Sequence, residues 1–148
     1  MSGCTFFGHR DCPSSIKPKL REVLIDLIEN RRVDMFYVGN KGAFDAMVRL
    51  VLRELAQQYP QINYGVVLER MPRKQNESET TDYSDTMLPE GIEEVPPRFA
   101  ISWRNKWMLQ RSDYVVTYII HSWGGAAHFA EMAEKQRKVV INIGEECR

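Results

Sequence analysis

Short apolar runs of strand length alternate along this chain with longer segments in which apolar residues recur every three or four positions. The short runs predict five β-strands, at residues 4–8, 34–38, 62–68, 114–120 and 139–143. The periodic segments predict four helices, at residues 16–30, 43–59, 99–111 and 126–137. This alternation is typical of the α/β class, so we expect a Rossmann-like three-layer domain with a five-stranded, mostly parallel sheet.

One segment interrupts the alternation. Residues 70–97 are polar, contain prolines and show no hydrophobic period, so we interpret them as a long loop that is either a lid or disordered. The 148 residues fit one compact domain, and the sequence therefore predicts a single domain at 1–148 that carries this loop.

Charge and cysteine content narrow the classes of partner. Lys and Arg together number 20, as do Asp and Glu, so we expect no membrane contact and regard nucleic acid as an unlikely partner. The three cysteines have no paired spacing, which indicates neither a disulfide framework nor a metal site, and no cofactor is indicated. Without an apolar leader or membrane-length run, we expect a cytoplasmic protein.

Two predicted strand-to-helix loops carry candidate ligand-binding residues, because ligands of open α/β sheets bind beyond the carboxyl ends of the strands. The first loop contributes Gly8, His9 and Arg10. The second has glycines where a helix begins, which favours close approach of an anion to the backbone, and it contributes Gly39, Asn40, Gly42 and Asp45. The alternative for each is a simple turn, with solvated charges in the first and with Asp45 complementing the helix dipole in the second.

The third loop joins the fourth predicted strand to the last helix. Its paired glycines again favour an anion, and its candidates are Ser122, Trp123, Gly124, Gly125 and His128, with Glu131 further along the helix. The preceding helix adds Arg104, whose planar fork suits a phosphate, together with Lys106. Trp103 and Trp107 on that helix either stack on a base or fill the core.

Taken together, FFGHR, VGNKGAFD and RNKWMLQRSDYVVTYI followed by SWGGAAHFAEMA resemble the SLOG superfamily, closest to its YpsA-like branch. The carboxyl-terminal half is also similar to the Lonely Guy phosphoribohydrolases, which release a base from a nucleoside monophosphate. That family pairs an arginine and a lysine on one helix with the motif PGGxGTxxE. The resemblance implies ligand roles for Lys106, Gly124 and Gly125, catalytic roles for Arg104 and Glu131, and a homodimer. Trp123, Ala127 and His128 replace the proline, third glycine and threonine of the motif.

The sequence thus predicts a module that binds or senses a nucleotide or nucleotide-derived small molecule in a cleft at the carboxyl ends of the strands. One alternative is a nucleotide N-glycosidase in which Arg104 holds the phosphate and Glu131 stabilises the ribose cation or activates water. The other is a non-catalytic interaction domain with Trp103 and Trp107 buried in a dimer contact.

Overall fold

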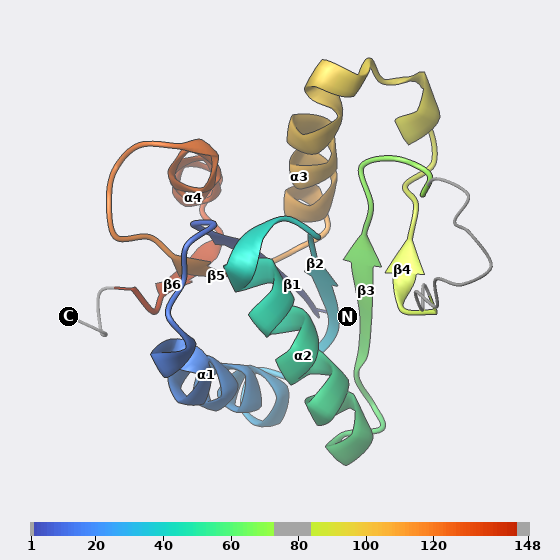
Figure 1. Cartoon of the computed structure of the whole chain (residues 1–148). Coiled ribbons are helices and arrows are strands. Elements are labelled where there is room, and N and C mark those ends of the chain that lie inside the picture. The colour runs from blue at the N-terminus through green and yellow to red at the C-terminus, as the bar shows by residue number, and fades with distance from the viewer. Residues whose placement is uncertain (1, 73–83, 145–148) are drawn as a thin grey trace.

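A parallel β-sheet of six strands forms the centre of the molecule. The computed structural model describes residues 2–72 and 84–144. The strands lie in the order β4-β3-β2-β1-β5-β6 (Figure 1). Their bounds are β1 (Ser2–Gly8), β2 (Val33–Val38), β3 (Asn63–Val67), β4 (Thr86–Met87), β5 (Tyr114–Tyr118) and β6 (Val139–Asn142).

Helices cover both faces of this sheet. On one face lie α1 (Lys17–Glu29) and α2 (Gly42–Gln58), and on the other lie α3 (Ala100–Gln110) and α4 (Gly125–Lys135) (Figure 1). Three short 3-10 helices, η1 (Ser14–Ile16), η2 (Ile92–Glu94) and η3 (Pro97–Phe99), lie in the connections. The prediction of a three-layer, Rossmann-like α/β domain is therefore confirmed. No helix within the described ranges is long and apolar enough to cross a bilayer.

The central strand β1 is buried on both faces, as expected for a parallel sheet between two helical layers. Phe6 points into the larger core, which α1 and α2 build with the sheet, and the adjacent Phe7 points into the smaller core beneath α3 and α4. The apolar spacing of α1 places Leu20, Leu24 and Leu27 in the larger core. The strand-and-helix pattern of the sequence thus determines which side chains are buried.

The expected count of five strands is wrong by one, because β4 adds a sixth. It lies inside the segment 70–97, which we predicted to be a loop, and it pairs in parallel with Val66 and Val67 of β3. A two-residue strand in a polar segment has no detectable period, since its position depends on tertiary contacts. Asp85, just before it, accepts hydrogen bonds from Arg49 Nε at 2.9 Å and from the Tyr64 hydroxyl at 3.0 Å. Residues 73–83 of the predicted loop lie outside the described residues.

Candidate functional site

A cleft of about 550 Å³ opens at the carboxyl end of β1. Its walls come from the loop after β1, the start of α2, one face of α3 and the loop that leads into α4. The lining residues proposed from the sequence are Gly8, His9, Arg10, Asp45, Arg104, Trp123, Gly124 and Gly125. The three loops that we expected to meet therefore do converge here, as the rule for open α/β sheets predicts.

Other candidates lie outside the lining of this cleft. Gly39, Asn40, Gly42, Lys106, Ser122, His128 and Glu131 are not among its lining residues. Glu131 is 64% exposed and forms an ion pair with Lys135 one helical turn further along α4, at 3.1 Å. The structure therefore does not assemble the pair of Arg104 and Glu131 that the phosphoribohydrolase resemblance implies.

Three aromatic rings stack in a row at the edge of the cleft. The His9 and His121 ring centroids are 3.7 Å apart, and those of His121 and Trp123 are 3.6 Å apart with the planes within 10° of parallel. Trp123 ends the row and is 70% exposed. His121 was missed by the sequence analysis. Its position directly before Ser122, in the loop after a buried strand, is the signal that could have identified it.

The stack depends on a neutral His9. The backbone N–H of Ile120 donates to His9 Nε2 at 3.0 Å, so this nitrogen acts as an acceptor and the imidazole is uncharged. Burial, together with the adjacent His121, lowers the pKa of His9 below its usual value. Protonation would remove the acceptor that Ile120 uses and place a charge against His121.

This geometry gives a prediction for stability against pH. A histidine with a lowered pKa contributes stability that is present above about pH 6.5 and is lost as the pH falls through the lowered pKa. We expect wild-type protein to lose more stability between pH 7 and pH 5 in urea titrations than His9→Gln does. His128→Gln, which changes an exposed histidine, should follow the wild type, and identical pH dependence in wild type and His9→Gln would contradict the prediction.

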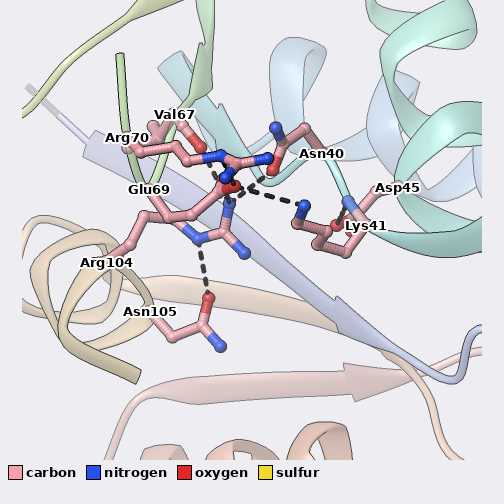
Figure 2. Close-up of polar contacts among 8 residues, drawn as sticks. All are labelled: Asn40, Lys41, Asp45, Val67, Glu69, Arg70, Arg104 and Asn105. Carbon is pink, nitrogen blue, oxygen red and sulfur yellow. Dashed lines mark hydrogen bonds and ion pairs between the residues drawn. The ribbon is translucent and has the colours of Figure 1, made fainter. Parts of the chain in front are cut away.

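The floor of the cleft is built around Arg104, which is only 2% exposed (Figure 2). Its Nη1 donates to the Val67 carbonyl and to Asn40 Oδ1, both at 2.9 Å, and its Nε donates to Asn105 Oδ1 at 3.1 Å. Glu69 Oε2 lies 3.7 Å from Nη1, and Glu69 also pairs with Lys41 at 3.2 Å. Arg104 thus ties α3 to the loops that follow β2 and β3.

Burial and neighbouring charges shift the pKa values of Asp45, Glu69 and Arg104 in this network. Burial raises the pKa of Asp45 to about 6, against the opposing effects of the Lys41 backbone N–H at 3.0 Å and of the Arg104 charge. Burial also lowers the pKa of Arg104, although the charges of Asp45 and Glu69 counteract it. For Glu69, burial is outweighed by hydrogen bonds and by Lys41 and Arg104, so its pKa lies below the usual value. Asp45 therefore changes charge just below neutral pH.

The amino terminus of α4 borders the mouth of the cleft. Gly124 precedes the helix with φ of 98°, a backbone conformation that side chains other than glycine rarely adopt. Gly124, Gly125 and Ala126 line the cleft at the positive end of the helix dipole, and the cations Arg10 and Lys41 line it as well. Within residues 2–72 and 84–144, no three metal-ligating side chains are grouped as a metal site requires.

No family model and no curated protein matches the sequence. The fold, however, is similar to that of DNA processing protein A (DprA) from Streptococcus pneumoniae, with a TM-score of 0.66 and 15% identity over 94% of this chain and 49% of that one. It is also similar to DNA processing protein A from Helicobacter pylori, described for its single-stranded DNA binding mode, with a TM-score of 0.59 and 12% identity over 98% of this chain and 70% of that one. This chain thus spans about half the length of the first of these proteins.

These neighbours correct three expectations. They are DNA processing proteins, so the assignment to the YpsA-like branch is wrong. The H. pylori protein is described by its binding of single-stranded DNA, so the expectation of a nucleotide-derived small molecule is wrong, as is the view that nucleic acid is an unlikely partner. The physical reason is that the net charge of zero is a property of the whole chain, whereas a partner meets the local charges of one cleft.

Proposed function

We propose that this chain binds single-stranded nucleic acid, and in particular single-stranded DNA, along the cleft at the carboxyl end of β1. The observation that carries the proposal is the ring stack of His9, His121 and Trp123, which ends on an exposed indole. Single-strand binding proteins combine such stacking platforms with cations that follow the backbone, because every base has a face that can stack. The two neighbouring histidine rings hold the indole in place, so a base that stacks on it meets a platform that is already ordered.

The charges beside the stack suit a phosphate backbone. Arg10 and Lys41 line the same cleft, and the amino terminus of α4 offers backbone N–H groups at its positive end. A strand whose base lies on Trp123 would place its phosphates toward these groups. The described binding of single-stranded DNA by the H. pylori protein of the same fold supports this class of ligand.

The proposal favours single strands over duplexes. In a duplex each base is already stacked between its neighbours, so none can lie on Trp123 without being extruded. With only two lysine or arginine contacts to phosphate, the affinity should fall modestly with salt, with a slope of roughly −1 to −2 in log–log form. The cytoplasmic location and the self-association expected from the sequence stay predictions.

Fluorescence anisotropy with a labelled oligothymidine tests the proposal. We expect the protein to bind the single strand more tightly than a duplex of the same length, and Trp123→Ala to weaken single-strand binding on the order of tenfold. Phe99→Ala is the matched control, because Phe99 is also an exposed aromatic residue but does not line the cleft. Equal binding of single strand and duplex, or an unchanged affinity in Trp123→Ala, would refute the proposal.

A further inference from the structure

The floor of the cleft differs chemically from its mouth, because a carboxyl and a guanidinium group lie side by side there. A β-carbon built on Gly39 would lie 2.8 Å from Asp45 Oδ2 and 3.2 Å from Arg104 Nη2, so the two polar groups border the same small space. Both residues also line the cleft. A hydrogen-bond acceptor and a donor are thus presented together at the bottom of the site.

Part of the hydrogen-bonding capacity of this floor is unused by the protein. Arg104 uses Nε and Nη1 within the network, whereas its Nη2 makes no hydrogen bond to any residue in the described part of the chain (Figure 2). Asp45 accepts through Oδ2 from the Lys41 backbone N–H, and its Oδ1 has no hydrogen-bond donor among the described residues. The side-chain N–H₂ of Asn105, which also lines the cleft, likewise donates to none of them. A ligand can therefore use these two donor groups together with Asp45 Oδ1 and the second lone pair of Asp45 Oδ2.

This arrangement suits the edge of a base better than a phosphate. A carboxylate repels a phosphate, whereas a paired donor and acceptor match a neutral edge that carries both kinds of group. The walls above the floor are apolar and include Phe7, Ile101 and Met108, so they fit a flat ring. A cleft of about 550 Å³ is large enough for one nucleotide.

We propose that the cleft takes one unstacked base of the bound strand, edge first, and that Asp45 and Arg104 read this edge with a preference for guanine. This inference rests on the proposed binding of single strands. Guanine alone places a ring N–H and an amino group side by side for one carboxylate, with its O6 carbonyl beside them for the Arg104 donor. Adenine and cytosine offer the carboxylate an amino group without a ring N–H, and thymine offers a ring N–H without an amino group.

A base series tests the inference with the unmodified protein. Oligothymidines that carry one guanine, adenine, cytosine or inosine at the centre are compared with the all-thymine strand by fluorescence anisotropy. We expect the guanine strand to bind about tenfold more tightly than the adenine strand, as a good bidentate contact to a base allows. Inosine, which lacks the amino group, should fall between the two. Equal affinities, or a preference for another base, would overturn the inference.

Two variants separate this inference from the proposed function. Asp45→Asn replaces one carboxylate oxygen by an amide N–H₂, so the side chain can no longer accept from both guanine donors. The ratio of guanine-strand to adenine-strand affinity should therefore fall to about one, whatever the change in the affinity for the all-thymine strand. Trp123→Ala should weaken all strands by a similar factor and leave the preference in place. If the guanine preference persists in Asp45→Asn, the inference that Asp45 reads the base is overturned, but the proposed binding of single strands is not. If the wild-type protein binds none of the strands, the proposed function is overturned as well.

Discussion

Arg104→Met is expected to lower the free energy of unfolding by about 3–5 kcal/mol, the cost of breaking a buried ion pair by removing one partner. Arg104 is 2% exposed and is the buried cation of the network. Its loss leaves Glu69, whose side chain is 9% exposed, with Lys41 and Arg70 as its ion-pair partners among residues 2–72 and 84–144. It also removes the hydrogen bonds to Val67 and Asn40. Methionine replaces much of the volume, so the effect is mainly electrostatic.

Urea titrations at pH 7 measure this loss, and Arg31→Met is the control because Arg31 is exposed. Glu69→Gln in the Arg104→Met background should recover part of the stability, since it removes a carboxylate that lacks its buried partner. If the Arg31 and Arg104 variants were equally stable, the network would not have the role assigned to it.

The stability lost in Arg104→Met should also depend on pH. The folded-state pKa of Asp45 is raised to about 6 from the usual 3.8, so its contribution to stability is fully present below pH 3.8 and is lost as the pH rises through about 6. The Arg104 charge opposes this rise, so removing it should raise the Asp45 pKa further. The destabilisation by Arg104→Met is therefore expected to be larger at pH 7 than at pH 5.

The sequence predicts the layers of this fold well because burial on both faces leaves an unambiguous pattern. In β1, Cys4, Phe6 and Phe7 place apolar side chains on both faces, as a central strand requires, and α1, α2 and α4 show the matching helical period. The meeting of the three loops is also predictable, because the carboxyl ends of parallel strands lie at one edge of the sheet. The convergence of Gly8, Asp45 and Gly124 at the cleft was therefore predictable without coordinates.

What could not be predicted depends on contacts between distant segments. The helix α3 carries apolar residues on both faces, so its sequence did not reveal that Arg104 points inward while Lys106 remains exposed. The stack of His9 on His121 joins residues more than a hundred positions apart, and neither histidine has a local pattern that indicates it. The argument from net charge against nucleic acid failed for a similar reason, because composition averages over charges that the fold separates.

The burial of Arg104 also changes how the cleft should be understood. The sequence suggested that its planar fork grips a phosphate, but two of its three nitrogens are used by Asn105, Asn40 and the Val67 carbonyl. Among the described residues, Nη2 alone of the three nitrogens has no acceptor, so Arg104 offers a ligand one directed donor group. Arg10 is exposed at the cleft and is better placed to follow a mobile phosphate backbone.

Gly8→Ala is expected to lower the free energy of unfolding by about 3 kcal/mol, at the upper end of the usual cost of overpacking a core. The added β-carbon would lie 2.2 Å from Phe44 Cδ2 and 2.9 Å from Phe44 Cβ. Phe44 is fully buried in the larger core, so its ring cannot turn away into solvent. Because Gly8 directly precedes His9, the resulting shift should also disturb the ring stack and weaken binding of a single strand.

Gly125→Ala provides the control, since a β-carbon there meets nothing within 4 Å and alanine favours the helix that begins at this residue. Phe44→Leu supplies the second test, because a smaller side chain at that position makes room for the new methyl group. Alone, Phe44→Leu should destabilise the core, but combined with Gly8→Ala it should cost less than the sum of the two single changes. Strict additivity, measured in urea, would mean that contact with Phe44 is not the reason for glycine at position 8. If the double variant loses less stability than the sum of the single variants, Gly8 is in contact with Phe44 of α2. The position of His9, and with it the ring stack, would then depend on the packing of the larger core.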